Sequence, residues 1–246
     1  LVRSRAEAKR VIEEGLVLVR GLPAERPTTM VASSDPIRLA GPVSAFVSRG
    51  GDKLDGALAD LHVPVERRRW LDLGASTGGF TDRLLQGGAA SVIALDVGYG
   101  QLDWRLRNDP RVHVIERTNA RLLAPGDLPF VPDAVTADLS FISLTVVLPV
   151  VVGLAADDAD HLLLVKPQFE VGRASVGKGG VVRDPELWRA AVQRVADAAA
   201  GLGLGVAGAT ASRLPGPAGN REFFLHLHRG AESPPDAIER AIAGAA

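Results

Sequence analysis

Four charged side chains occur at positions where a folded chain could bring them to one reactive site. Asp138 follows one apolar run, Lys166 closes the next and Glu222 opens the last. Lys53 follows two glycines in the segment Ser48-Arg-Gly-Gly-Asp-Lys-Leu54, which could act as a flexible hinge that folds over a site. Open α/β sheets bind ligands beyond the carboxyl ends of their strands, so Asp138 and Lys166 are expected to face one crevice, with Glu222 near the same edge. Taken singly, each charge is more typical of a solvated surface than of catalysis.

A glycine-rich segment, Asp72-Leu-Gly-Ala-Ser-Thr-Gly-Gly-Phe80, joins the first strand of this sheet to its first helix. Glycines permit a tight turn there and let a ligand approach the backbone and the helix N-terminus. Asp96 closes the next strand about 20 residues further on, where an acidic side chain accepts hydrogen bonds from ribose hydroxyls. The pattern therefore favours a nucleoside-containing cofactor, and a methyltransferase in particular.

Two alternatives to this interpretation remain. A dinucleotide dehydrogenase would carry G-x-G-x-x-G, but Ser76 occupies the second glycine position, and the glycines are doubled at Gly78-Gly79. The segment could also be a purely structural turn between strand and helix, since lone glycine motifs are weak. The spacing of the glycines disfavours NAD binding, but it does not exclude a purely structural turn.

The residues directly after the fourth strand narrow the choice of methyl acceptor. Methylases of base amino groups usually carry Asn-Pro-Pro-aromatic there, whereas this chain has Asp138-Leu-Ser-Phe-Ile142. Methylation at pyrimidine carbon five generally needs a cysteine nucleophile, and the sequence contains no cysteine. Oxygen is the common acceptor that remains.

A parallel sheet flanked by helices is predicted to position these residues. From about Phe46 onward, apolar strand-like runs alternate with helical patterns, which is typical of such a sheet. Seven strands are expected, as in a methyltransferase-type sheet: Arg69–Leu73, Val92–Asp96, Val112–Ile115, Ala134–Ala137, Leu162–Val165, Gly205–Ala211 and Phe223–Leu227. Helices are expected at Phe80–Gln86, Leu144–Leu154 and Pro185–Leu202, the last with Asp184 as its cap.

A small unit precedes the sheet. A capping box at Ser4 and Glu7 predicts a helix that Gly15 closes in the left-handed conformation. Strand-like pieces follow at Leu16–Val19 and Ile37–Leu39, with a turn at Arg20-Gly21. The unit has too little core to stand comfortably alone. We expect one domain over residues 1–41, a linker over 42–47 and the catalytic domain over 48–246.

Composition is that of a soluble globular protein, which allows an enzyme. Of the 246 residues, 46% are hydrophobic and 23% charged, and the formal net charge is −1, so any nucleic-acid binding must come from local patches. The absence of cysteine fits a reducing cytoplasm. The longest apolar run, Ile142–Ala156, is shorter than the ~20 residues of a membrane span, so we interpret it as a buried helix and expect no membrane association.

Two further motifs suggest sites that we do not expect to form. Gly172-Arg-Ala-Ser-Val-Gly-Lys-Gly179 resembles a phosphate-binding P-loop, but a glycine replaces the final Ser or Thr and no helix follows. We interpret it as a mobile loop on the substrate side. The five histidines lack metal-ligand spacing, so we expect no metal site.

Taken together, the motifs resemble the TlyA family of ribosomal RNA cytidine 2′-O-methyltransferases, also called hemolysin-type, to about Arg229. The resemblance rests on these segments: Ser48–Leu54, Asp72–Phe80, Asp96-Val-Gly-Tyr-Gly-Gln-Leu102, Arg107-Asn-Asp-Pro-Arg111, Glu116-Arg-Thr-Asn-Ala120, Ala137–Leu144 and Val165-Lys-Pro-Gln-Phe-Glu-Val-Gly172. It implies a class I methyltransferase fold, Rossmann-like with a seven-stranded sheet. It also implies S-adenosylmethionine as cofactor and ribosomal RNA, within the ribosomal subunits, as substrate.

The resemblance also assigns residues. It implies a Lys-Asp-Lys-Glu tetrad, which falls here on Lys53, Asp138, Lys166 and Glu222. A ribose hydroxyl is a weak acid, so a base must lie within hydrogen-bond reach of it, and Lys166 is the candidate. With the turn chemistry, the resemblance nominates as cofactor-binding residues Gly74, Ser76, Thr77, Gly78, Gly79, Asp96, Asn119 and Asp138.

The N-terminal unit resembles the S-four-like RNA-binding domain that this family carries, here expected to lack its first helix. Its basic residues suit a phosphate backbone: Arg3, Arg5, Lys9, Arg10 and Arg20. A solvated helix face is the alternative, because Glu7, Glu13 and Glu14 dilute the charge. Two other functions remain as alternatives for the whole chain: a non-catalytic RNA-binding protein that keeps the fold, and a membrane-active hemolysin.

Overall fold

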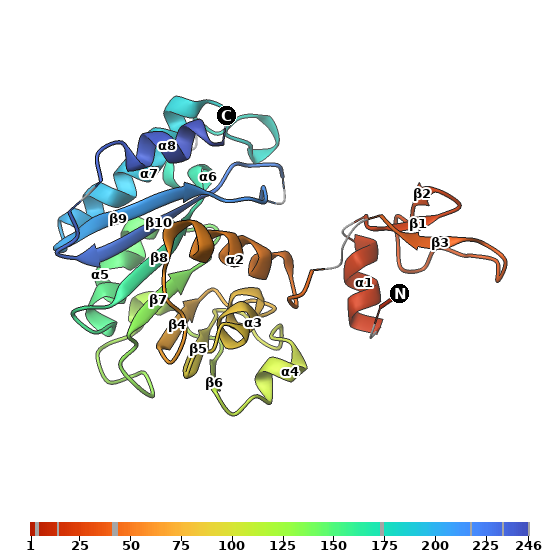
Figure 1. Cartoon of the computed structure of the whole chain (residues 1–246), viewed down its shortest axis with the longest axis horizontal. Helices are drawn as coiled ribbons and strands as arrows, with labels where there is room; N and C mark the ends of the chain where they lie inside the picture. Colours follow the sequence, from red (N-terminus) through yellow and green to blue (C-terminus); the bar gives the residue numbers. More distant parts are fainter. Residues whose placement is uncertain are drawn as a thin grey trace.

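The computed structural model describes residues 1–2, 5–13, 15–40, 44–172, 175–216, 218–232 and 234–245. Among them, seven strands form one large sheet in the order β6-β5-β4-β7-β8-β10-β9 (Figure 1). The strands are β4 (Arg69–Leu73), β5 (Ser91–Leu95), β6 (Val112–Ile115), β7 (Ala134–Ala137), β8 (Asp160–Val165), β9 (Leu204–Ala211) and β10 (Phe223–Arg229). All seven predicted strands are therefore confirmed, within two residues at each end.

The strand directions correct one expectation. Strands β4 to β8 pair in parallel, but β10 pairs antiparallel with both β8 and β9, so the sheet is mixed. The reason is the connection from β9 to β10, residues 212–222, which contains no helix among its described residues. A short connection of this kind returns the chain antiparallel, whereas a parallel neighbour needs a crossover.

Helices cover both faces of the sheet (Figure 1). They are α2 (Arg49–Leu61), α3 (Gly79–Gln86), α4 (Trp104–Arg107), α5 (Leu144–Leu154), α6 (Pro167–Glu170), α7 (Pro185–Ala200) and α8 (Ala237–Ala243), with short 3-10 turns η1 (Ala120–Leu122) and η3 (Lys178–Gly180). The three predicted helices are confirmed as α3, α5 and α7, and the Asp184 side chain caps α7 by accepting from Glu186 N.

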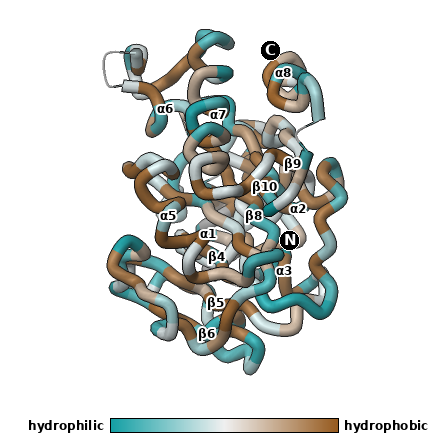
Figure 2. The backbone as a smooth tube through the Cα atoms, turned by 90° about the vertical axis from the view of Figure 1, so that its left-hand side faces the viewer, coloured by the Kyte–Doolittle hydropathy of each residue, from teal (hydrophilic) through white to brown (hydrophobic). Residues whose placement is uncertain are grey.

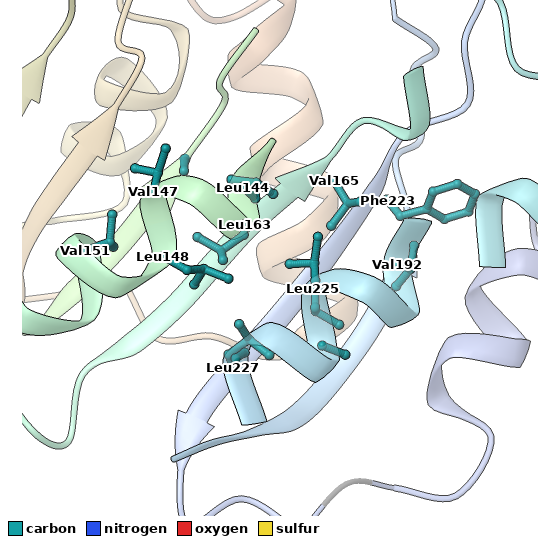
Figure 3. Packing of buried hydrophobic residues seen from close by; sticks show 14 of the residues in the cluster. Leu144, Val147, Leu148, Val151, Leu163, Val165, Val192, Phe223, Leu225 and Leu227 are labelled. Carbon is teal, nitrogen blue, oxygen red and sulfur yellow. The ribbon is translucent and has the colours of Figure 1, made fainter. Parts of the chain in front are cut away.

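The core is divided by the sheet because successive side chains of a strand point to opposite faces. Trp70 and Phe224 belong to the cluster under α2 and α3, whereas Leu71 and Phe223 belong to the cluster under α5, α7 and α8. Figure 3 shows the second cluster, in which Phe223 and Leu225 of β10 face Val192 of α7. Figure 2 shows hydrophobic residues along α5 and neighbouring strands. Burying each such side chain contributes about 1.5–3 kcal/mol to the stability of the folded protein. The packed core thereby holds in place the strand ends that carry the site.

The N-terminal unit has its own small core. Helix α1 (Arg5–Glu13) packs beside a sheet that, within residues 15–40, has the order β2-β1-β3, formed by β1 (Val17–Val19), β2 (Leu22–Pro23) and β3 (Ile37–Leu39). Gly15 has a φ of +71°, which confirms the left-handed helix end. The predicted capping box falls on Ser4 and the Glu7 side chain, which lie outside the described residues.

Candidate active site

Lys53 and Glu222 form a buried ion pair at the carboxyl edge of the sheet. Lys53 lies in α2 with 6% of its surface exposed, and Glu222, directly before β10, has 1% exposed. Lys53 Nζ donates a hydrogen bond to Glu222 Oε2 at 2.5 Å. Because β10 is antiparallel to β8 and Phe223 pairs with Val165, this register brings Glu222 beside Lys166 at the end of β8.

The expectation of a flexible hinge before Lys53 is wrong. Gly50 and Gly51 lie inside α2. Gly51 is needed there because a Cβ on it would lie 2.3 Å from Phe46 Cβ, whereas a Cβ on Gly50 would make only an ordinary contact, 3.4 Å from the Phe80 ring. Gly51 therefore lets α2 pack closely against Phe46, and Lys53 is held in place by a helix.

The turn before Glu222 closes over the ion pair. A Cβ on Gly216 would lie 2.4 Å from Glu222 Oε1, so glycine is needed for this approach. Arg49 Nη2 donates to Pro215 O at 3.0 Å and ties the turn to the start of α2. Glu222 Oε1 has no hydrogen-bond partner among the described residues. An acceptor that is buried and unpaired in this way has free capacity for a ligand.

Lys166 and Asp138 form a second ion pair across neighbouring strands. Lys166, with 8% of its surface exposed, follows β8, and Asp138 follows β7. Lys166 Nζ lies 2.5 Å from Asp138 Oδ1, a charge contact without hydrogen-bond geometry, and donates to Ser140 Oγ at 3.1 Å. The structure thus brings the four expected charges together as two Lys-carboxylate pairs at one edge.

The glycine-rich turn after β4 has the backbone that its sequence predicts, with φ of +80° at Gly74 and +96° at Gly78. The structure gives these glycines a packing role. A Cβ on Gly74 would lie 2.5 Å from Asp138 O, and one on Gly78 would lie 2.3 Å from Leu106 Cδ1. A Cβ on Gly79 would lie 2.2 Å from Ser48 Oγ. The turn is therefore pressed between the Asp138 loop, α4 and the start of α2.

The other nominated cofactor residues surround this turn. Asp96 accepts from Ser76 N at 2.8 Å and from Gly98 N at 2.6 Å, so its carboxylate joins the ends of β4 and β5. Thr77 O accepts from Asp103 N at 3.1 Å. Asn119 caps η1 by accepting from Arg121 N at 3.1 Å.

Asp72 is a functional candidate that the sequence reasoning did not single out beyond its place in the turn motif. Its carboxyl group is fully buried in β4 and accepts from Thr81 Oγ1 at 2.6 Å. Burial raises the pKa of Asp72 to about 7; the negative charges of Asp138 and Asp96 add to the increase, and the Thr81 hydrogen bond opposes it. Its Oδ1 has no hydrogen-bond partner within the part of the chain that the structure describes. The carboxylates of Asp96 and Asp138 thus create a negative potential around the turn, and this potential helps Asp72 to keep its proton.

Phe141 is a second residue that sequence reasoning missed. It lies in the loop after Asp138, its side chain is 91% exposed, and its φ is +64°, which is unfavourable for a residue with a Cβ. Its ring centroid lies 5.3 Å from that of Phe169. The signal was available in the motif Asp138-Leu-Ser-Phe-Ile142, since an aromatic residue in a loop beside a candidate site is a possible stacking surface.

The nominated RNA-binding residues are only partly described. Arg3 and the side chains of Arg5 and Arg10 lie outside the described residues. Lys9 is exposed and lies 3.7 Å from Glu13, and the exposed Arg20 guanidinium lies 3.7 Å from Asp35. Both cations are exposed, and ion pairs of this length at the surface are weak, so both cations remain available to a stronger anion.

The P-loop-like segment is described only in part, and its described residues have no P-loop geometry. Arg173 and Ala174 lie outside the described residues, and Lys178–Gly180 forms a 3-10 turn, with α7 beginning only at Pro185. Among the described residues, no group of three or more His, Asp or Glu side chains is placed to hold a metal ion. No helix within those same ranges is long and apolar enough to cross a membrane.

Comparison with known proteins identifies the family. The family model of FtsJ-like methyltransferases matches residues 46–229. The chain belongs to this family. Over 98% of the chain and 93% of the relative, it is 53% identical to the 16S/23S rRNA (cytidine-2′-O)-methyltransferase TlyA of Mycobacterium tuberculosis strain H37Rv.

Solved structures resemble this chain over most of its length. A structure described as a hemolysin from Streptococcus thermophilus matches with a TM-score of 0.82 and 39% identity, covering 99% of this chain and 90% of that one. An S-adenosylmethionine-dependent methyltransferase from Mesorhizobium loti matches with a TM-score of 0.53 at 15% identity, over 72% of this chain and 98% of that one. The second likeness concerns the methyltransferase fold alone.

Proposed function

We propose that this FtsJ-like protein methylates the ribose 2′-hydroxyl of a cytidine in ribosomal RNA, with S-adenosylmethionine as the methyl donor. The observation that carries the proposal is the presence of two ion pairs, Lys166–Asp138 and Lys53–Glu222, at the carboxyl edge of the sheet. The glycine-rich turn after β4 lies at the same edge. The acceptor nucleotide and the ribosomal substrate come from the relative that is 53% identical, whose name states both.

The turn after β4 fits this cofactor in charge. S-adenosylmethionine carries a sulfonium and an ammonium group, and the carboxylates of Asp96 and Asp138 beside the turn would stabilise these cations. The unpaired Asp72 Oδ1 and the spare lone pairs of Asp96 are free acceptors. Gly74, Ser76, Thr77, Gly78, Gly79 and Asn119 complete the proposed binding set. The bound cofactor would supply an electrophilic methyl group on sulfur.

The tetrad would act on the acceptor oxygen. Transfer of the methyl group from the cofactor's sulfur to the 2′-oxygen would require the 2′-hydroxyl to give up its proton. Lys166 would hold the hydroxyl near the methyl group and, after losing its own proton, would accept the proton of the hydroxyl. Asp138 and Ser140 fix the direction of Lys166 Nζ, while the Lys53–Glu222 pair supplies a second ordered cation beside it.

RNA recognition would be shared between two parts of the chain. Phe141 offers an exposed ring on which an unstacked base can lie, a contact typical of RNA-binding proteins. We assign residues 1–41 to an S-four-like RNA-binding domain, 42–47 to a linker and 48–246 to the methyltransferase domain. The basic residues Arg3, Arg5, Lys9, Arg10 and Arg20 would contact phosphates. The substrate would be ribosomal RNA within ribosomal subunits, in the cytoplasm.

The test is methyl transfer from tritiated S-adenosylmethionine to unmodified ribosomal subunits, followed by alkaline hydrolysis. A 2′-O-methyl group blocks cleavage of the adjacent phosphodiester, so the label should appear in alkali-stable dinucleotides. Lys166→Ala and Asp138→Ala should lose this label, with Asp158→Asn, an exposed position, as control. Label in mononucleotides would overturn the ribose assignment. Cofactor binding without any transfer would favour a non-catalytic RNA-binding protein.

A further inference from the structure

Glu170 is a buried carboxylate that the proposed mechanism does not use. It is the last residue of α6, the short helix that begins directly after Lys166, and only 3% of its surface is exposed. Both side-chain oxygens have partners: Oε2 accepts from Ser143 Oγ at 2.5 Å and Oε1 from Leu144 N at 2.8 Å. Hydrogen bonds to a buried charged group are stronger than neutral ones.

The partners of Glu170 belong to the segment that carries Asp138. Ser143 ends the loop 138–143 and is the cap residue of α5, where its Oγ accepts from Thr145 N at 3.2 Å. Asp138 and Ser140, which lie in the same loop, both contact Lys166 Nζ. Glu170 therefore joins the end of the Asp138 loop to the segment that follows Lys166.

Two neighbouring contacts show that this junction is built as a unit. The rings of Phe141 and Phe169 lie 5.3 Å apart and connect the same two segments on the exposed side. Arg194 Nη1 of α7 donates to Glu170 O at 2.8 Å and fixes α6 against the long helix. Burial raises the pKa of Glu170, whereas its hydrogen bonds and the Arg194 charge act in the opposite direction.

We propose that Glu170 is a positioning residue for methyl transfer, which sets the approach of Asp138 and Ser140 to Lys166 by clamping the two segments that carry them. The proposal rests on the proposed function, since it concerns the same site. Without the carboxylate, Leu144 N loses its acceptor and Ser143 Oγ keeps only its contacts with Thr145, so the loop is free to move away from Lys166. A displacement of about 1 Å in such a group can lower the rate on the order of 100-fold.

The experiment compares Glu170→Ala with Glu170→Gln in the full chain. Glutamine can still accept from Leu144 N, and its amide can donate to Ser143 Oγ, so it should keep the clamp. We expect Glu170→Ala to lower kcat about 10- to 100-fold with the KM for S-adenosylmethionine changed less than about threefold, and Glu170→Gln to restore most of kcat. Glu239→Ala, which removes an exposed partner of Arg189, is the matched control.

A second readout does not depend on activity. Reductive methylation with formaldehyde labels lysines at rates set by their exposure and hydrogen bonding, and mass spectrometry follows Lys166 alone. Lys166 should react faster in Glu170→Ala than in the wild type, and slowly in Glu170→Gln. Unchanged labelling or unchanged kcat in Glu170→Ala would overturn the positioning role. If the wild type transfers no methyl group, the proposed function fails, while the labelling still decides whether Glu170 holds Lys166.

Discussion

Lys53 and Glu222 lie 169 positions apart in the sequence, yet their side chains meet at 2.5 Å in the interior of the protein. The ion pair joins α2, which precedes the sheet in the sequence, to the residue directly before β10, a strand that runs antiparallel to its neighbours β8 and β9. It thereby fixes one side of the candidate active site against the other.

Breaking the Lys53–Glu222 pair should be costly. Glu222→Ala leaves the Lys53 charge buried without a partner, so the free energy of unfolding should fall by about 3–5 kcal/mol. The double change Lys53→Met with Glu222→Leu removes both charges and should recover most of that loss while remaining inactive. Urea unfolding of the three proteins measures the differences. Equal stability of the single and double variants would contradict a buried, mutually dependent pair.

Lys166 should be irreplaceable by another cation. Lys166→Ala should lower kcat by about 10²- to 10⁴-fold, the usual range for a lost acid-base group. Lys166→Arg can keep the charge contact with Asp138, but a guanidinium does not release its proton at accessible pH, so a loss of at least about 100-fold is expected. Single-turnover kinetics at saturating cofactor give these values. An arginine variant of near-normal kcat would mean that Lys166 contributes charge alone.

Asp72 should make stability depend on pH. Its pKa rises from 3.8 to about 7 on folding, so the folded protein keeps a proton that the unfolded chain has released. The free energy of unfolding should therefore fall as pH increases from about 4 to 7, by up to about 1.4 kcal/mol per unit, and then level off. Asp72→Asn should lack this decrease.

The comparison for Asp72 is the difference in unfolding free energy between the wild type and each variant across that pH range. Asp158→Asn, at an exposed position, serves as control and should keep the wild-type slope. A parallel pH dependence of the wild type and Asp72→Asn would show that Asp72 is not the titrating group.

Phe141 should matter for RNA and little for folding. Stacking of one base on an aromatic ring contributes about 1–3 kcal/mol, so Phe141→Ala should raise the KM for ribosomal subunits about tenfold or more. Its ring is exposed, and the melting temperature should stay within a few degrees. Phe141→Tyr keeps the ring and should behave as the wild type. An unchanged KM in Phe141→Ala would exclude stacking at this position.

Much of the fold was predictable because apolar runs and breakers mark its elements locally. The run Leu162–Val165 and the cap at Asp184 predicted β8 and α7 nearly to the residue. The direction of β10 was not anticipated, because alternation of strands and helices does not reveal which connection lacks a helix. It follows from the short connection between β9 and β10, whose proline and glycine residues predict a turn but not the direction of the strand that comes after it.

The sequence predicts which residues belong to the site, but it does not predict how their side chains are arranged in space. Lys53 was assigned to a flexible segment because paired glycines usually loosen a chain, whereas here Gly51 admits the Phe46 ring against α2. The raised pKa of Asp72 and the clamp made by Glu170 depend on burial and on partners far along the chain. Such properties arise only when the strand ends are brought together in space.

The position of the transferred methyl group on the nucleoside distinguishes ribose methylation from base methylation. After incubation with unmodified ribosomal subunits and S-adenosylmethionine, the RNA is digested completely to nucleosides and analysed by tandem mass spectrometry. We expect a new methylated cytidine that fragments into an unmodified cytosine base and a methylated ribose, and that is missing with Lys166→Ala. A fragment in which the cytosine base carries the methyl group would contradict transfer to the 2′-hydroxyl.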